Sequence, residues 1–150
     1  FLIPRDAVYD RDVTKFSLDE MISNLSRLSV LSIINTITLF MDVTYINPEE
    51  SSGLLWDYPD LPEKISILSS NSNGETSQLY NDKKHSFFTY SLLKGFSGNA
   101  DDGNNIIDLG EITEYIYKSV PENIRTQPGS IRQNPKFNGL DLKRIILDLR

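Results

Sequence analysis

An acid and a hydroxyl stand two residues apart, after the stretch that most resembles a buried strand. Residues 36–41 are rich in Thr, Ile, Leu and Phe, and Asp42 and Thr44 follow them. A hydroxyl can serve as a nucleophile, but it gives up its proton far less readily than a thiol, and threonine nucleophiles use an N-terminal amine as their base. Thr44 is internal and has no such amine, so we expect no catalysis from this chain alone. The simplest role for Asp42 is to hydrogen-bond the amides of the loop that follows.

A second group of polar side chains, in residues 100–111, has the spacing of a degenerate calcium loop. An EF-hand loop ends in Glu at its twelfth position and has an aliphatic residue at the eighth. Counting back from Glu111 puts Ile107 at the eighth position, but it also puts Ala100 at the first ligand position and Asn105 where glycine is expected. A turn followed by a helix cap explains the stretch more simply, and we expect no metal or other cofactor. The weak calcium candidates are Asp101, Asp102, Asn104 and Glu111.

Composition excludes several classes of protein. A net charge of -6 and a pI near 4.7 argue against a nucleic-acid surface, because phosphate binding needs clustered Lys and Arg. The chain has no Cys, which excludes disulfides, thiolate metal sites and thiol nucleophiles. The longest apolar tract, residues 30–45, is interrupted by polar residues, so we expect no membrane span. The 150 residues suit one domain and do not begin with Met. We therefore expect a piece of a longer protein, and among compartments we favour the cytoplasm.

The elements that would position these residues alternate between helix and strand. Ser17 and Glu20 form a capping box ahead of apolar residues at helical spacing, which predicts a helix over residues 17–28. Strands are expected over residues 32–44 and 64–69, and a second helix over residues 86–96. A third helix opens at Asp108, has Glu111 at its third position and ends at Pro121. A strand over residues 144–149 follows. The alternation predicts an α/β fold with a mostly parallel sheet flanked by helices.

Several motifs, in order along nearly the whole chain, resemble the caspase-like cysteine peptidases of the bacterial and metacaspase type. Residues 42–45 are similar to the end of the family's catalytic strand, Asp-Ala-Cys-Phe/Tyr, with Thr44 at the nucleophile position. Residues 87–101 resemble Gly-x-Phe-Thr-Tyr-Ala-Leu-Leu-x-Gly-Leu-x-Gly-x-Ala-Asp, the strongest match. Four shorter segments resemble the family more weakly. Residues 1–7 resemble Tyr-Leu-(Ile/Val)-Pro-x-Asp-Ala, and residues 67–70 resemble a strand that ends in Ala-Ser. Residues 107–115 resemble (Ile/Val)-Thr-Leu-Gly-Glu-Leu-x-x-Tyr, and residues 133–135 resemble Gln-Thr-Pro.

The resemblance implies a caspase-like three-layer sandwich, with residues 1–150 as its C-terminal portion. The family's catalytic His lies on a strand upstream of the segment matched by residues 1–7, so the N-terminal strands are missing from this chain. His85, the single histidine, falls where the family has a variable loop, and we do not expect it to be catalytic.

The resemblance also implies a set of substrate-binding residues. Asp42 takes the place of the acid in the specificity pocket of metacaspase-like members, which implies a preference for Arg or Lys. Ser69 and Ser70, at the end of the second strand, are further candidates. Trp56 could line the substrate cleft or cover a sheet edge.

Three functions remain open. The first is a pseudo-protease that serves as a regulatory or partner-binding module, and a natural Thr44 favours it. The second is the C-terminal part of an active cysteine endopeptidase with Arg or Lys specificity, inactive here because of Thr44 and the missing N-terminal part; the retained Asp42 favours it. The third is an interaction domain that shares only the fold. An incomplete sheet exposes an edge and apolar surface, so we expect the chain to bind its own N-terminal part, another protein domain or a peptide, and neither nucleic acid nor membrane.

Overall fold

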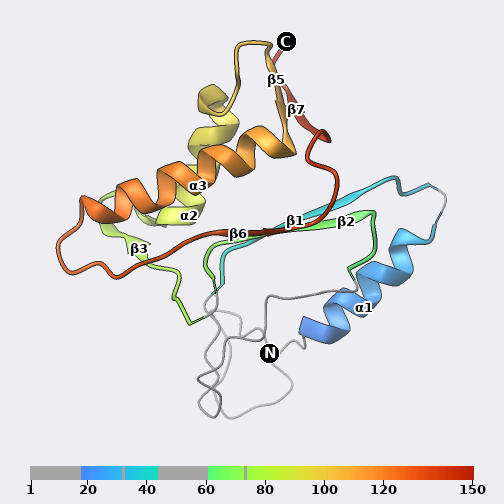
Figure 1. The fold of residues 1–150 in the computed structure, drawn as a ribbon, viewed down its shortest axis with the longest axis horizontal. Helices are drawn as coiled ribbons and strands as arrows, with labels where there is room; N and C mark the ends of the chain where they lie inside the picture. The colour runs from blue at the N-terminus through green and yellow to red at the C-terminus, as the bar shows by residue number, and fades with distance from the viewer. Residues whose placement is uncertain (1–17, 32, 44–60, 73) are drawn as a thin grey trace.

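A small mixed sheet stands between helices in the computed structural model, which describes residues 18–31, 33–43, 61–72 and 74–150 (Figure 1). The sheet has the order β1-β2-β6, from β1 (Ile37–Met41), β2 (Ile65–Ser69) and β6 (Lys136–Asn138). Helix α1 (Leu18–Ser29) lies on one side of it, and α2 (Phe87–Lys94) and α3 (Leu109–Arg125) lie on the other. The predicted α/β class is confirmed.

Two apolar clusters hold the helices against the sheet. Successive strand side chains point to opposite faces, so one strand can supply both clusters. On the first face, Ile65 and Ile67 of β2 and Met41 of β1 are buried and pack against α1. On the other face, Leu68 is fully buried with Phe87 and the apolar side chains of α3. All five residues of β2 are buried, as expected for a strand in a sheet that is covered on both sides.

Strand direction differs from the expected mostly parallel pattern. β1 and β2 are parallel, in the register Ile37 to Ile65 through Met41 to Ser69. β6 is antiparallel to β2, because its first residue, Lys136, pairs with Ser69 and so enters at the carboxyl end of β2. β3 (Leu79–Tyr80) and β4 (His85–Ser86) form an antiparallel hairpin around the 3-10 turn η2 (Asn81–Lys83). Within the described ranges, β1–β2 is the one parallel pairing.

The predicted strand over residues 144–149 is present but does not join the central sheet. β7 (Ile145–Asp148) pairs antiparallel with β5 (Ile106–Asp108) in a separate ribbon, at the top of Figure 1. Arg144, just before β7, still reaches the sheet, because its guanidinium donates to the Ile37 carbonyl (3.3 Å) and the Thr38 hydroxyl (3.1 Å). The apolar pattern identified the strand, whereas its partner depended on the path of the chain.

The predicted strand over residues 32–44 is shorter in the structure. β1 spans five residues, because β2 offers five partners and no more. Before it, the N–H of Ile34 donates to the Leu31 carbonyl in a turn, and Ile33 is 85% exposed. High β-propensity alone did not extend the strand without a neighbour to pair with.

Helix α2 ends earlier than predicted. It stops at Lys94, and the wider turn η3 (Gly95–Asn99) carries the chain onward, with Gly98 at φ 102°. A left-handed backbone of this kind is open to glycine at little cost. Gly95 is buried against Ile112 and Tyr115 of α3, so a larger side chain has no room at the point where the chain turns.

The prediction that α3 ends at Pro121 is wrong. The helix continues through Pro121 to Arg125. A proline inside a helix removes one backbone hydrogen bond and costs about 3 kcal/mol. Continuing the helix buries Ile124, which is 6% exposed, beside Val120, and full burial of such a side chain contributes about 1.5–3 kcal/mol. Tertiary burial offsets the local penalty.

None of the described helices combines the length and the apolar content that crossing a membrane requires.

Candidate functional site

Asp42 lies at the carboxyl end of the parallel strand pair β1–β2. It follows Met41, the last residue of β1, and the Ser70 N–H donates to the Met41 carbonyl across 2.8 Å. Met41 pairs with Ser69, so Asp42 and Ser70 leave the sheet side by side. Open α/β sheets bind their ligands at this end of the strands. The fold therefore brings the predicted Asp42, Ser69 and Ser70 to one edge.

Three hydroxyl groups donate hydrogen bonds to the Asp42 carboxylate. Ser77 donates to Oδ1 at 2.5 Å, Thr89 donates to Oδ2 at 2.5 Å, and Ser86 donates to the same Oδ2. Ser86 is also the N-cap of α2, where its Oγ accepts from the Thr89 N–H at 2.9 Å. The carboxylate thus sits beside the start of a helix, where the peptide dipoles favour a negative charge. Side-chain hydroxyls take the role that the sequence assigned to loop amides.

The charge of Asp42 remains available to a ligand. Asp42 is exposed, and none of the ion pairs in the described part of the chain includes it. A carboxylate has about four lone-pair positions, and the three hydroxyls occupy three of them. One position on Oδ1 and the negative charge can therefore accept a cationic hydrogen-bond donor.

Ser69 and Ser70 are buried, and their hydroxyls bond within the protein. Ser69 Oγ donates to the Lys136 carbonyl at 3.0 Å, which links β2 to β6. Ser70 Oγ lies 2.7 Å from Asn71 Oδ1 and accepts from the Val43 N–H at 3.2 Å. Ser70 therefore fixes the backbone just after Asp42, and both serines support the site in the structure as described.

A buried amide network was not identified as a site by sequence reasoning. Gln133 is 1% exposed; its Nε2 donates to the Ser70 carbonyl at 2.8 Å, and its Oε1 accepts from the Gln78 N–H at 3.0 Å. Gln78 follows Ser77, so this network holds the loop that supplies one of the hydroxyls to Asp42. The one sequence signal for this network is the Gln-Asn-Pro motif at residues 133–135, and the motif alone indicates no role for Gln133.

Two predicted residues, Thr44 and Trp56, lie outside the described residues, as do residues 1–7 and Ser17.

His85 is described and exposed. It precedes Ser86 on β4, and side chains alternate along a strand, so the imidazole points away from the side on which Ser86 meets Asp42. His85 instead lines a separate hollow with Tyr90 and Lys94.

The acidic loop is held by its own hydrogen bonds. Asp101 Oδ1 accepts from the N–H groups of residues 103, 104 and 105, at 3.0–3.1 Å. Asp108 and Glu111 form the predicted capping box: the Glu111 N–H donates to Asp108 Oδ1, and the Asp108 N–H donates to Glu111 Oε2, each at 2.8 Å. Carboxylate oxygens of Asp101, Asp102 and Glu111 lie within 4.8 Å of one another. Asn104 uses its Oδ1 to accept from the Ile106 N–H at 2.7 Å. The turn and the helix cap are both present.

Comparison with known proteins gives no match: no family model, no curated protein and no solved structure resembles this chain significantly.

Proposed function

We propose that this chain is a non-catalytic, caspase-like domain portion that binds a peptide or protein partner by docking an Arg or Lys side chain on Asp42. One observation carries the proposal. An exposed carboxylate at the carboxyl end of parallel strands is held by three hydroxyls, and no ion pair in the described ranges neutralises it. The likeness of residues 42–45 and 87–101 to caspase-like motifs supports the family assignment.

The geometry favours recognition of a basic group over tight binding. The hydroxyls fix the carboxylate before a ligand arrives, so little side-chain entropy is lost on docking. An exposed ion pair contributes only about 0–1 kcal/mol, so we expect Asp42 to select the basic side chain and neighbouring contacts to supply most of the affinity. Because one position remains on Oδ1, the carboxylate can accept a single donor, which a guanidinium or an ammonium can equally supply.

The chemistry of the chain supports binding without cleavage. Peptide hydrolysis of the caspase type needs a thiolate and an imidazole that moves the protons. The chain has no Cys, and its one histidine, His85, lies on the side of β4 opposite to Asp42. Thr44 stands where the resemblance puts the nucleophile.

A second candidate function follows from the same Asp42. A specificity acid has a purpose in an enzyme that cuts after Arg or Lys, so the chain could be the C-terminal part of an active cysteine endopeptidase in which Thr44 replaces the nucleophile. The two candidates predict the same selectivity for basic side chains. They differ in whether Thr44→Cys, in the whole parent protein, produces cleavage.

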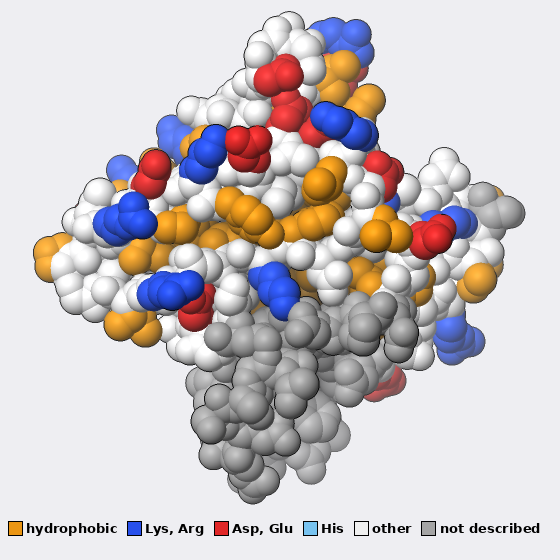
Figure 2. All heavy atoms as spheres, viewed as in Figure 1, with side chains coloured by type: hydrophobic (Ala, Val, Ile, Leu, Met, Phe, Trp, Pro, Cys, Tyr) orange, Lys and Arg blue, Asp and Glu red, His pale blue; other side chains and the backbone are white. Residues whose placement is uncertain are grey.

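Apolar surface supports a protein partner. Figure 2 shows apolar side chains gathered in a band across the middle of the molecule, at the level of the sheet in Figure 1. Elsewhere Val30 is 79% exposed and Ile33 is 85% exposed, just after α1. Exposed apolar side chains that cluster are typical of interaction surfaces. A missing N-terminal portion of the same domain or a second protein domain would cover them.

The test compares two fluorescent peptides that end in Arg or in citrulline, which has the same shape without the charge. We expect the chain to bind the Arg peptide about two- to fivefold more tightly, in line with an exposed ion pair. Asp42→Asn keeps the shape of the side chain and should bring this ratio to about one. The matched control is Glu114→Gln, which removes one exposed carboxylate from α3 and should leave the ratio unchanged.

Equal binding of the two peptides by the unaltered chain would overturn the assignment of Asp42. Cleavage is tested separately with fluorogenic peptides ending in Arg, Lys or Asp, using the whole parent protein and its Thr44→Cys variant. Cleavage by the unaltered parent would contradict the non-catalytic assignment. Cleavage by the variant alone would mean that a pocket and a base surround an absent nucleophile, and it would favour the second candidate over the first.

A further inference from the structure

A basic hollow lies beside α2, on a different side of β4 from Asp42. It has a volume of about 370 Å³ and is lined by Lys83, His85, Tyr90, Leu93, Lys94 and Ser97. His85 lies on β4 and Lys83 on η2, while the other four belong to α2 and η3. Three segments therefore converge on one depression.

The charge of this hollow opposes the charge of the chain. The whole sequence carries a net charge of -6, yet no Asp or Glu lines the hollow. Neither Lys83 nor Lys94 takes part in the ion pairs found in the described part of the chain. The positive charge of the hollow is thus not cancelled by a neighbouring carboxylate at its wall.

Aromatic rings hold one of the two lysines in place. The Lys83 amine lies 5.8 Å from the centre of the Tyr90 ring and 5.9 Å from that of the Tyr80 ring. An ammonium group at this distance is attracted by the ring face. The Tyr80 ring in turn stacks on the buried Phe87 ring, with centres 4.6 Å apart. The exposed Lys83 therefore lies beside two aromatic rings, one of which stacks on the core.

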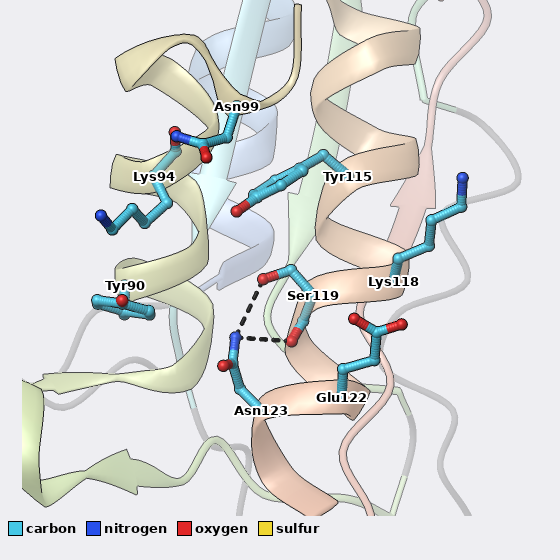
Figure 3. Close-up of a pocket in the computed structure, with 8 residues that line it drawn as sticks. All are labelled: Tyr90, Lys94, Asn99, Tyr115, Lys118, Ser119, Glu122 and Asn123. Carbon is cyan, nitrogen blue, oxygen red and sulfur yellow. Dashed lines mark hydrogen bonds between the residues drawn. The ribbon is translucent and has the colours of Figure 1, made fainter. Parts of the chain in front are cut away.

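A second, polar hollow adjoins the first one. It has a volume of about 460 Å³, lies between α2 and α3, and shares Tyr90 and Lys94 with the basic hollow. Figure 3 shows Tyr115 reaching into the space between the helices, while Lys118 extends away from it. Asn123 donates to the Ser119 carbonyl at 2.8 Å on the same wall. A ligand that is larger than a single anion has room to continue into this polar space.

From these observations we infer that the basic hollow binds a phosphomonoester group. A phosphomonoester carries a charge of about -1.5 to -2 at neutral pH, close to the +2 of Lys83 and Lys94. Its three free oxygens accept several hydrogen bonds, and the walls offer two ammonium groups, an imidazole and a phenol as donors. A carboxylate has half the charge and two oxygens, so it matches this donor set less well. The site is independent of Asp42 and adds an anion receptor to the proposed cation receptor.

The test titrates phenyl phosphate and inorganic phosphate into the isotope-labelled chain and follows the backbone amide signals by NMR. We expect saturable shifts centred on residues 83–97 with both ligands. Phenylacetate, a carboxylate of similar shape, should bind about tenfold more weakly.

Two double variants separate a built site from general charge attraction. Lys83→Gln with Lys94→Gln should weaken phosphate binding at least tenfold, roughly the loss expected for two charged hydrogen bonds. Arg132→Gln with Lys143→Gln removes the same charge from exposed positions outside both hollows, 84% and 92% exposed, and should change binding less than about twofold. His85→Gln, which leaves both lysines, should give an intermediate loss.

Three results would overturn the inference. The first is the absence of saturable shifts up to about 10 mM phosphate, beyond the range of even weak specific binding. The second is an equal loss in both double variants, which would mean that the anion responds to net charge alone. The third is a set of shifts centred away from residues 83–97. If the first double variant does not fold, His85→Gln decides the same question, because unchanged binding there would contradict the site.

Discussion

The hydroxyl cluster around Asp42 gives the sharpest prediction about this fold. Replacing Asp42 with Ala removes three hydrogen bonds that tie the end of β1 to the loop before β3 and to the start of α2. A hydrogen bond to a charged group contributes about 1.5–3 kcal/mol when sheltered. Asp42 is exposed, so we take about 1 kcal/mol for each bond after solvent screening. Asp42→Ala should therefore lower the free energy of unfolding by about 2–3 kcal/mol.

A double-mutant cycle isolates one of these bonds. Thr89→Val removes the hydroxyl 2.5 Å from Asp42 Oδ2 and keeps the shape of the side chain, and it leaves the Thr89 N–H to Ser86 bond in place. The coupling energy between Asp42→Ala and Thr89→Val should be about 1 kcal/mol. The assay is urea unfolding followed by circular dichroism, with all four proteins at one pH.

The control for lost charge is Asp82→Ala. Asp82 is an exposed acid on η2, and we expect its removal to change stability by no more than about 0.5 kcal/mol. A coupling energy below about 0.3 kcal/mol would refute the reasoning, because independent sites add within that range. The contact of the Thr89 hydroxyl with Asp42 would then contribute nothing to the stability of the fold.

Three further predictions concern packing and charge. Gly95→Ala would place a Cβ in collision with Ile112 Cδ1, so it should lower the free energy of unfolding by about 1–3 kcal/mol, as measured with urea. Ile112→Val removes that methyl group and should recover part of the loss in the double variant. Pro121→Ala restores a helical N–H and should raise the free energy of unfolding by about 1–3 kcal/mol. An unchanged value would mean that the proline carries no local penalty at this position of α3. The side-chain hydrogen bond from Arg150 lowers the pKa of Asp148 from its ordinary 3.8 to about 2. The contribution of this pair to stability is therefore present above about pH 4 and is lost as the pH falls through 2. A carboxyl NMR titration should show the Asp148 midpoint near pH 2 and an upward shift in Arg150→Gln; equal midpoints would exclude the pair in solution.

The helices were predicted well where their signals are local. The capping box of Asp108 and Glu111 acts over three residues, so it appears in the sequence and in the structure alike. Helix α1 also matches its predicted span within a residue, because its apolar spacing determines which face packs on the sheet. Pro121 is the exception, since the penalty is local and the burial of Ile124 that offsets it is not.

Strand pairing was harder to predict than strand position. The apolar runs at residues 64–69 and 144–149 indicated strands in the right places. Apolar periodicity and β-propensity do not indicate which strands pair with each other. The strand that became β7 was therefore expected in the central sheet, although it pairs with β5. The short β6 was not expected at all, because Lys136, Phe137 and Asn138 lack the apolar alternation of a longer strand.

The sequence by itself determined the α/β class, the helix starts, the absence of a thiol and the choice of Asp42 as a candidate binding residue. It did so because composition, caps and apolar spacing act within one or two turns of chain. Tertiary structure alone decided what surrounds Asp42, since its hydroxyl partners lie 35, 44 and 47 residues away. It also decided that Gln133 secures Ser70 from 63 residues away, and that Lys83 and Lys94 share one hollow. Such pairings depend on the order of strands and the path of loops, which local residue preferences do not encode.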